Sequence, residues 1–365
     1  MVSVCIPAYG HAGEVRRLLE TLAEQDYPRM EINISDDSEG REVEEALCAL
    51  ASMQPVGGGE NAFASKPGDV EETASAACPG DAEETASAAS PGDAETILNG
   101  TLPRRNAAPL FVRYVRNRKK KGHVLNWNAA IRMADKEAAY LKIFFSDDYC
   151  TGPDTIRSFV ELLEETPEAA LAFSGSRQVL LHDDAPAAEQ TDYTDRHAEE
   201  KFVRALAEDY RELFLGNQIG APSATMIRTG RLCHAQENPV DPDHRKNVAA
   251  SRFLFDEESG FASDVFLYMD VLKDYPRFAW TRRPLVAIGL HDAQYTEGFS
   301  EKDERIYVDY RLLYDKHRLW EKASCRAYML RHLILPYRKG WTEAKACRIP
   351  WREYAMAFVR YKNPF

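Results

Sequence analysis

Short apolar runs alternate with amphipathic segments along most of the chain. Strands are predicted where apolar and β-branched residues run together and stop at Pro, Gly or Asp, and helices where apolar residues recur three or four positions apart. The predicted strands are residues 2–6, 31–35, 110–115, 140–145, 171–181, 224–227 and 285–290. The predicted helices are residues 12–24, 43–50, 124–134, 153–163, 199–214 and 260–272, with more helix beyond residue 303. This alternation predicts an α/β fold with a mostly parallel sheet flanked by helices.

A twelve-residue repeat interrupts the pattern. It reads PGDVEETASAAC from Pro67 and PGDAEETASAAS from Pro79, and a degenerate copy begins at Pro91. These units hold almost no large apolar side chains and cannot bury a core. We therefore predict a disordered acidic insertion at residues 55–105 within a main domain of residues 1–300. A helical extension of residues 301–365 follows.

Charge and cysteine content narrow the class of protein. The formal net charge is −12, and the segment from Glu60 to Glu95 holds nine acidic residues against one base. Nothing in this distribution indicates a nucleic-acid partner. The seven cysteines are odd in number and form no CxxC pair, which argues against a disulfide framework or a zinc site. The chain opens on a strand and has no apolar run of the ~18–20 residues that span a bilayer, so we expect a cytoplasmic protein.

Acidic pairs and a histidine follow three predicted strands. Asp36 and Asp37 follow the second strand, Asp147 and Asp148 follow strand 140–145, and His291 follows the last strand. In open α/β sheets, ligands bind in the crevice beyond the carboxyl ends of the strands. Adjacent carboxylates repel unless a cation or hydrogen-bond donors compensate them, and Mg²⁺ binds one or two carboxylates together with substrate phosphates. An exposed acidic turn is the alternative interpretation of the pair after strand 140–145.

The order and spacing of these segments resemble family 2 glycosyltransferases with the GT-A fold. The segments VSVCIPAYG and INISDDS resemble the nucleotide-binding start of that family. VRNRKKKGHVLNWNAAI and YLKIFFSDD resemble its Asn/Gly-rich loop and its metal-binding strand. GFASDVFLYMD and PLVAIGLHDAQYT are weaker echoes of the segment with the catalytic base and of the closing His strand. The resemblance covers residues 2–298 outside the repeat, so the main domain would be catalytic.

The resemblance implies an inverting, non-processive transfer of one sugar. The donor would be a nucleotide-diphosphate sugar, a UDP-sugar first of all. The acceptor would be a hydroxyl of a glycan or a lipid-linked molecule in cell-surface polysaccharide synthesis. A divalent metal, Mg²⁺ or Mn²⁺, would neutralise the diphosphate that leaves.

The resemblance also implies roles for individual residues. Asp264 matches the catalytic base, Asp148 with help from Asp147 would hold the metal, and His291 would complete or orient that site. One of the two asparagines after Gly122 would face the donor, and the other would cap or pack. Contacts to the nucleotide sugar are implied for Pro7, Ala8, Tyr9, Asp36, Asp37, Gly122, Asn126, Asn128 and Asp147.

Each role has a structural alternative. Asp264 could be an acid favoured by the dipole at a helix N-terminus, and His291 could simply pack after its strand. The acids at 36 and 37 could form a strand-end turn.

Two other functions also stay open. Ser263 stands where the family has an acid, which favours a degenerate, non-catalytic nucleotide-sugar-binding module.

The other open function is a metal-dependent nucleotidyltransferase. It is disfavoured because residues 7–11 contain no Lys or Arg after the first strand. Gly10 also departs from the family pattern, which usually has Asn there. No QxxRW-like segment follows Asp264, which argues against a processive synthase.

The C-terminal segment is basic and aromatic. Residues 330–341 and 351–361 mix Arg and Lys with Trp, Tyr, Phe and Leu, as in helices that lie on anionic membrane surfaces. Peripheral contact with the inner face of a membrane is therefore one hypothesis. The alternative is an amphipathic helix packed on the catalytic domain, with its basic face in solvent.

Overall fold

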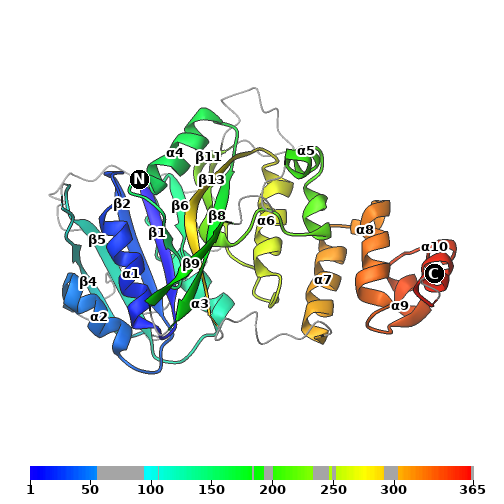
Figure 1. Ribbon diagram of the computed structural model, residues 1–365, viewed down its shortest axis with the longest axis horizontal. Coiled ribbons are helices and arrows are strands. Elements are labelled where there is room, and N and C mark those ends of the chain that lie inside the picture. The colour runs from blue at the N-terminus through cyan, green and yellow to red at the C-terminus, as the bar shows by residue number, and fades with distance from the viewer. Residues whose placement is uncertain are drawn as a thin grey trace, which may run out of the picture.

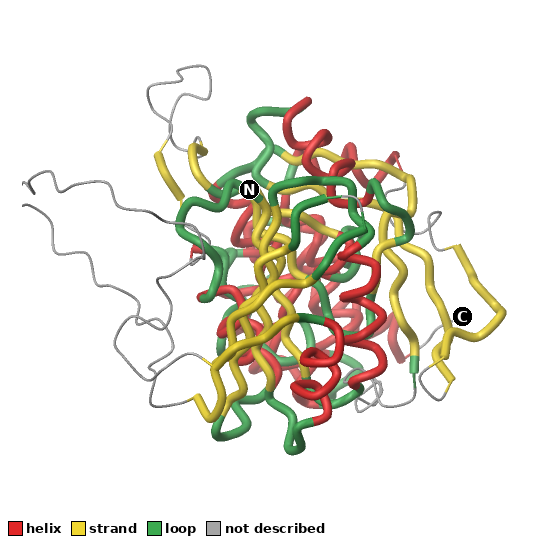
Figure 2. The backbone as a smooth tube through the Cα atoms, turned by 90° about the vertical axis from the view of Figure 1, so that its left-hand side faces the viewer, coloured by secondary structure: helices red, strands yellow, loops and turns green. Residues whose placement is uncertain are grey.

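A mixed β-sheet with helices on both faces forms the centre of the computed structural model (Figures 1 and 2). The residues that the structure describes are 1–55, 94–105, 107–182, 185–192, 200–232, 246–248, 252–291 and 303–362. Within these ranges the sheet has eleven strands in the order β3-β4-β5-β2-β1-β6-β10-β8-β13-β7, and β9 pairs with β8.

The strands of the large sheet and of a separate antiparallel pair, β11 and β12, have the following bounds. They are β1 (Val2–Ala8), β2 (Met30–Asp36), β3 (Ser52–Pro55), β4 (Ala94–Leu102), β5 (Leu110–Asn117), β6 (Tyr140–Ile143), β7 (Tyr149–Cys150), β8 (Leu171–His182), β9 (Ala185–Asp192), β10 (Thr225–Arg228), β11 (Gly230–Leu232), β12 (Lys246–Val248) and β13 (Phe278–Leu290).

The α-helices and shorter helical turns connect and cover these strands. The α-helices are α1 (Ala12–Ala23), α2 (Glu42–Leu50), α3 (His123–Arg132), α4 (Thr155–Glu165), α5 (Glu200–Glu208), α6 (Ser263–Asp274), α7 (Glu304–Lys316), α8 (Ala323–Tyr328), α9 (Gly340–Ala346) and α10 (Trp351–Lys362). The turns are η2 (Tyr210–Leu215), η3 (Pro222–Ala224), η7 (Leu319–Glu321) and the π-helical η8 (Met329–Ile334).

Four parallel strands carry the predicted donor side of the molecule. β5, β2, β1 and β6 lie side by side and parallel, with Ala8 opposite Asp36 at the ends of β1 and β2. Because parallel strands end at one edge, the residues that follow β1, β2 and β6 come together there. The predicted α/β fold, with a sheet flanked by helices and a C-terminal helical extension, is confirmed. The sheet is mixed rather than mostly parallel, because β3, β4, β7, β9 and β10 pair antiparallel with their neighbours.

Alternation along the strands divides the core into two clusters. On β1, Val4 and Ile6 pack with α1, α2 and α4, whereas Cys5 packs in the other cluster with α3, α6 and α7. On β6, Leu141 and Ile143 belong to the α3 and α6 cluster, and Tyr140 to the cluster with α1. Successive side chains of a strand point to opposite faces, so these buried strands need helices on both sides.

The predicted insertion at residues 55–105 is wrong at its C-terminal end. Residues 94–102 form strand β4, which pairs antiparallel with β5 on one side and with β3 (Ser52–Pro55) on the other. Leu98 and Leu102 are buried against the sheet, so this degenerate copy of the repeat has enough apolar residues to join the sheet. The remainder of the predicted insertion, residues 56–93, lies outside the described residues.

Two other element boundaries differ from the prediction. The predicted helix 199–214 is divided at Asp209, whose carboxylate accepts a hydrogen bond from the Arg211 amide and starts η2. The predicted strand 285–290 begins earlier, at Phe278, because β13 pairs in parallel with β8 from there to Leu290. Tertiary pairing extends this strand through a bulge around Pro284.

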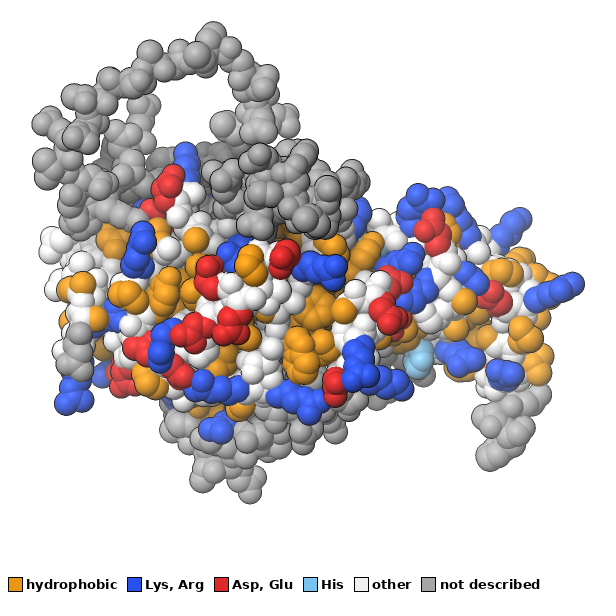
Figure 3. Space-filling view, turned by 90° about the horizontal axis from the view of Figure 1, so that it is seen from above, with side chains coloured by type: hydrophobic (Ala, Val, Ile, Leu, Met, Phe, Trp, Pro, Cys, Tyr) orange, Lys and Arg blue, Asp and Glu red, His pale blue; other side chains and the backbone are white. Residues whose placement is uncertain are grey.

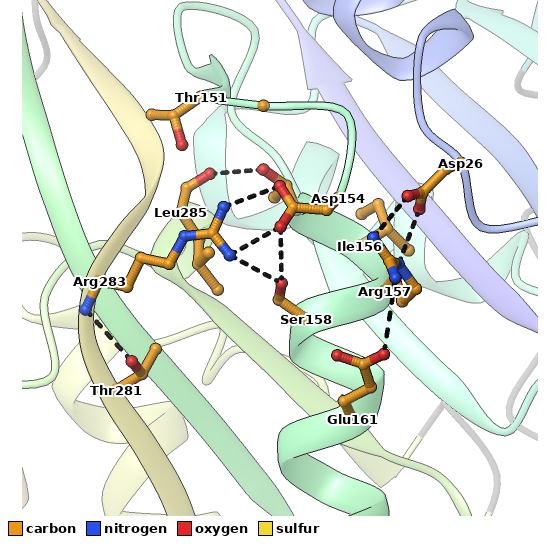
Figure 4. Close-up of polar contacts among 12 residues, drawn as sticks. Asp26, Thr151, Asp154, Ile156, Arg157, Ser158, Glu161, Thr281, Arg283 and Leu285 are labelled. Carbon is orange, nitrogen blue, oxygen red and sulfur yellow. Dashed lines mark hydrogen bonds and ion pairs between the residues drawn. The ribbon is translucent and has the colours of Figure 1, made fainter.

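Polar contacts fasten β13 to the start of α4 (Figure 4). The guanidinium of Arg283 reaches Asp154, with Nη1 2.7 Å from Oδ2, and the Thr155 hydroxyl donates to the Leu285 carbonyl at 2.9 Å. One turn further on, Arg157 pairs with Asp26 after α1 at 2.8 Å. These contacts fix the strand whose end carries His291.

The last three helices form a lobe beyond α7, at the opposite end of the molecule from β3 and β4 (Figure 1). We call residues 323–362 the C-terminal lobe. It joins the main core through Leu330, Leu333 and Ile334 of η8. Among the helices of the described ranges, none is both long enough and apolar enough to cross a bilayer.

Candidate active site

Asp37 holds the loop that follows β5. Its carboxylate accepts hydrogen bonds from the backbone amides of Lys121 and Gly122, each at 2.8 Å, and from the Asn117 side chain at 2.9 Å. The Asp37 amide donates to the Ala8 carbonyl at 2.9 Å. Gly122 has φ of +89°, a conformation that residues with a Cβ rarely adopt. The ends of β1 and β2 and the loop 117–122 are thus locked together.

Tyr9 lies at the same edge and is 47% exposed. The Lys120 ammonium sits 3.8 Å from the centroid of its ring. The next amide, from Gly10, donates to the Ser38 hydroxyl at 2.7 Å, so the backbone after β1 is tied to the segment after β2. An exposed aromatic ring with a cation above it can stack against a planar base and face a phosphate.

Asp36 and the two asparagines have different surroundings. Asp36 is fully buried and accepts hydrogen bonds from Ser38 and from the Tyr114 hydroxyl at 2.6 Å. Asn126 donates to the Ala8 carbonyl at 3.0 Å, which places it beside the end of β1. Asn128 is also fully buried, and both ends of its amide bond the backbone of Phe255. Asp36 and Asn128 therefore hold the frame of the site.

The acidic pair after β6 divides into a reachable and a buried carboxylate. Asp147 keeps 19% of its side chain exposed, and its Oδ2 lies 3.4 Å from Nε2 of His291. The His291 ring is 5.2 Å, between centroids, from the ring of His11, which follows β1. Asp148 is only 2% exposed and accepts a hydrogen bond from the Gly289 amide at 3.1 Å. Burial and the neighbouring charge of Asp147 raise the pKa of the Asp148 carboxyl well above its usual value.

A buried lysine lies close to this acidic pair and bonds a neighbouring segment of backbone. Lys142 of β6 is fully buried, and its ammonium donates to the carbonyls of Ser223 and Thr225, the latter at 2.9 Å. Burial lowers the pKa of Lys142 to about 7. The Ser223 hydroxyl accepts from the Phe145 amide at 2.9 Å, and its hydrogen bond to Asp148 favours the ionised carboxylate.

Asp264 lies in the first turn of α6 and is partly buried. Its carboxylate accepts hydrogen bonds from the Asn217 side chain at 2.6 Å and from the Val265 amide at 2.8 Å. Burial nevertheless raises the pKa of Asp264 to about 6. A carboxylate with this pKa is ionised at neutral pH and basic enough to accept a proton from a reacting hydroxyl. The start of α6 is held by Asp309, which accepts from the amides of Gly260 and Ala262.

One loop connects the two groups of acids. The segment 216–225 carries Asn217, which bonds Asp264, and Ser223, which bonds the segment after β6. Its Gly220 carbonyl accepts from Tyr268 of α6 at 3.0 Å. The structure thus places Asp264 of α6 near one end of this short loop and the acids that follow β6 near its other end.

Several residues of this site carry no signal in the sequence. They are Asn117, Asn217 and Ser223, which bond the predicted acids, His11, which contacts His291, and Lys142, which bonds the carbonyls of residues 223 and 225. All of these are tertiary contacts. The glycines and proline of the segment 216–222 predict a loop, but the pattern gives no partner for its side chains.

The residues after β6 and β13 fit a divalent cation that shares its ligands with a substrate. No group of three or more His, Cys, Asp or Glu side chains is placed to hold a metal by itself within the ranges that the structure describes. Asp147 and His291 offer one carboxylate and one imidazole at a partly exposed position. Mg²⁺ and Mn²⁺ favour oxygen ligands and take several of them from substrate phosphates.

Comparison with protein families identifies the class of protein. Residues 100–229 match the family model described as glycosyl transferase family 2. The chain carries a family 2 glycosyltransferase domain. The matched segment contains the acidic pair after β6 and the loop 216–225, and it leaves Asp37, Asp264 and His291 outside. The predicted family and the glycosyltransferase class are confirmed.

The family 2 domain also resembles solved structures. S. aureus TarS 1–349 in complex with UDP-GlcNAc superposes with a TM-score of 0.51 at 12% identity, over 98% of this chain and 79% of that one. A second S. aureus TarS structure gives 0.49 at 13% identity, over 96% of this chain and 46% of that one. At this identity the first likeness concerns the GT-A fold alone. No curated protein matches the chain.

Proposed function

We propose that this family 2 domain transfers one sugar from a nucleotide-diphosphate sugar to an acceptor hydroxyl, with inversion. The observation that carries the proposal is the loop 216–225, which contacts Asp148 after β6 through Ser223 and the acid of α6 through Asn217. A donor held at the strand ends would then meet an acceptor held beside Asp264. The family match leaves the nucleotidyltransferase alternative without support.

The donor would bind across the ends of β1, β2 and β6. The exposed ring of Tyr9 and the fixed loop 117–122 would contact the nucleotide, and Lys120 would face its phosphates. The UDP-GlcNAc in the TarS structure makes UDP-sugars the first donors to test. Asp147 and His291, with Asp148 behind them, would hold Mg²⁺ or Mn²⁺, which would offset the charge of the leaving diphosphate.

Asp264 would act as the general base. As the acceptor oxygen forms its bond to the anomeric carbon, Asp264 takes the hydroxyl proton. The bond from that carbon to the diphosphate oxygen breaks on the opposite face, and its electron pair leaves with the diphosphate. A single displacement of this kind inverts the anomeric configuration. The acceptor would be a glycan or a lipid-linked molecule made on the cytoplasmic side of a membrane.

Calorimetric titration of UDP, GDP and dTDP, each with and without Mn²⁺, tests the donor site. Wild type should bind one nucleotide in a metal-dependent way, and Asp147→Asn should lose the metal dependence. Asp148→Asn should lose it too without a lower melting temperature, because the raised pKa of Asp148 means that its ionised form does not stabilise the fold. A chain that binds no nucleotide under either condition would overturn the donor site.

The degenerate-module alternative is tested in the same system. Such a module would bind the nucleotide sugar but release no nucleotide diphosphate in the presence of any acceptor. Hydrolysis or transfer, monitored by release of the diphosphate, should be present in wild type and lost in Asp264→Asn, which still binds the nucleotide. Equal release by the two proteins would remove Asp264 from the mechanism.

A further inference from the structure

The C-terminal lobe has two aromatic, basic segments with opposite surroundings. The first, residues 330–341, packs largely inward, because Leu330, Leu333 and Ile334 lie in the main core. The burial of these residues favours the alternative for this segment, namely packing on the main domain with basic residues such as Arg331 and Arg338 in solvent. The second segment is α10, where Tyr354 is the one buried hydrophobic residue that the structure describes.

The outer side of α10 is unusually apolar for a surface helix. Its five exposed large hydrophobic residues are 39–58% accessible, and they are Trp351, Met356, Phe358, Val359 and Tyr361. Within the described residues, only four other large hydrophobic side chains are comparably exposed, and they lie on separate elements. Exposed hydrophobic residues that gather on one helix indicate a surface that contacts a partner or a membrane.

The helix is nevertheless well anchored. Tyr354 stacks with Trp351 and Phe358, at centroid distances of 5.7 and 5.9 Å, and lies 5.4 Å from Trp341 of α9. Glu353 pairs with Arg326 of α8 at 2.9 Å. These contacts fix α10 in the lobe, and Trp351 and Phe358 each pack one part of the ring on Tyr354 while staying partly exposed.

The positive charge of the C-terminal lobe favours an anionic partner. Residues 323–362 carry nine Lys and Arg against two acids, in a chain whose net charge is −12. On α10 itself, Arg352, Arg360 and Lys362 are exposed beside the apolar residues. Figure 3 shows Lys and Arg side chains mixed with hydrophobic ones at the end of the molecule that holds the lobe. Apolar and basic side chains on one helix suit a surface that is anionic outside and apolar beneath.

We propose that α10 docks the protein on an anionic lipid surface. Trp351, Met356, Phe358 and Val359 would enter the boundary between headgroups and acyl chains, while the basic residues face the phosphates. A soluble polyanion would satisfy the basic residues but leave the apolar side chains in water. This proposal is independent of the proposed function, because α10 contributes no residue to the site around Asp37, Asp147 and Asp264.

Co-sedimentation with vesicles tests the proposal. Wild type should bind phosphatidylcholine vesicles that contain phosphatidylglycerol, should bind pure phosphatidylcholine weakly, and should lose affinity as salt rises. Arg352→Glu with Arg360→Glu should lower the partition coefficient about thirtyfold or more, and Met356→Ser with Val359→Ser about tenfold. These side chains are exposed, so the variants should keep the wild-type melting temperature.

The matched control changes exposed residues of the same types elsewhere. Val308→Ser with Lys201→Glu, on α7 and α5, should bind vesicles as wild type does. Nucleotide binding, measured by calorimetry without vesicles, should be equal in all these variants. A failure of the membrane proposal is therefore distinguishable from a failure of the proposed donor site. Equal binding to pure phosphatidylcholine, or wild-type binding by both α10 variants, would overturn the proposal.

A second copy of the chain is the main competing occupant of this surface. Analytical ultracentrifugation of the same proteins separates the two cases. A concentration-dependent dimer that Met356→Ser with Val359→Ser dissociates, combined with no vesicle binding by wild type, would assign α10 to self-association and overturn the membrane proposal. A monomer that binds anionic vesicles would support it.

Discussion

The carboxylates at the proposed donor edge and on the proposed acceptor side have different hydrogen-bond partners. At the donor edge, Asp37 accepts hydrogen bonds from two backbone amides and a side-chain amide. On the acceptor side, Asp264 has one side-chain donor, Asn217, and the amide of the next residue, and burial raises its pKa to about 6. Both acids are at the ends of regular elements, so position along the chain does not separate them.

This difference fits the proposed roles, in which Asp37 orders a loop and Asp264 takes the proton. Several N–H donors stabilise the ionised form of a carboxylate and fix its position, and this suits an acid that orders a loop. A carboxylate with few donors in a partly apolar surrounding is a stronger base, which suits proton transfer. The following experiments compare the two sides, beginning with the largest expected effect.

Asp264→Asn should lower the turnover number by about 10²–10⁴, because the general base is lost. The Michaelis constant for the donor should change little, since Asp37 and the strand ends are intact. The variant should also be about 1–3 kcal/mol more stable than wild type above pH 6, because folding no longer buries an ionised carboxylate with a raised pKa. Steady-state kinetics and thermal denaturation measure both effects.

Asp270→Asn is the matched control, because Asp270 lies on the same helix near its other end and pairs with Lys316. It should leave the turnover number unchanged. A similar loss of activity in both variants would mean that α6 is sensitive to any change, and the assignment of Asp264 as base would fail.

Asp37→Asn should lower the free energy of unfolding by about 1–3 kcal/mol and weaken nucleotide binding, because the amides of Lys121 and Gly122 lose a charged acceptor. Chemical denaturation and calorimetry measure the two effects. Asp26→Asn removes an exposed ion pair with Arg157 and should cost less than about 1 kcal/mol. If Asp37→Asn is as stable as wild type, the hydrogen bonds to Asp37 do not stabilise the loop, and the contrast between Asp37 and Asp264 fails.

The pH dependence of kcat/KM, which reports the pKa values of the free enzyme, should have an acidic limb near pH 6. Burial raises the pKa of Asp264 to about 6, and the base works only when ionised, so the rate should fall about tenfold per pH unit below that value. The corresponding contribution to stability has the opposite direction, because protonated Asp264 is favoured in the fold below pH 6 and this advantage is lost as pH rises through 6. A limb near pH 4 would show an ordinary, solvated carboxylate.

Asn217→Ala should have the smallest effect, a displacement of that limb to higher pH. The Asn217 amide stabilises the ionised form of Asp264, so its removal raises the pKa of the carboxyl further. Activity should fall several-fold near pH 6 and less on the plateau. Gln218→Ala, at the neighbouring position of the same loop, should keep the wild-type profile. Identical profiles for wild type and Asn217→Ala would show that the hydrogen bond does not tune the base.

Local patterns predicted most of the fold and the acids of the site. Strands β1, β2, β5, β6 and β8 follow apolar runs, and the acids after β2 and β6 stand next to them in the chain. The prediction failed where pairing with distant segments decided the outcome. Residues 94–102 joined the sheet because β5 offered an edge, and their weak apolar pattern had suggested an insertion.

The partners of the acids could not be predicted in the same way. Asn217 bonds an acid 47 positions away, and Asn117 bonds one 80 positions away. Hydrogen bonds of this kind depend on the positions of two elements, whereas periodicity reports only the environment of each element by itself. Lys142 illustrates the limit, because a lysine inside an apolar strand is interpretable only once the carbonyls of Ser223 and Thr225 are in place.

The sequence by itself determined the alternation of strands and helices, the acids at the strand ends and the basic, aromatic composition of the C-terminal segment. These are local properties, since side-chain burial follows the period of the element that carries it. Tertiary structure alone decided that Leu330, Leu333 and Ile334 enter the core while most of α10 stays exposed. It also decided that amides hold Asp37 while Asp264 has a raised pKa. The burial and the pKa of a side chain depend on which distant groups pack against it. Those contacts form only when the whole chain has folded.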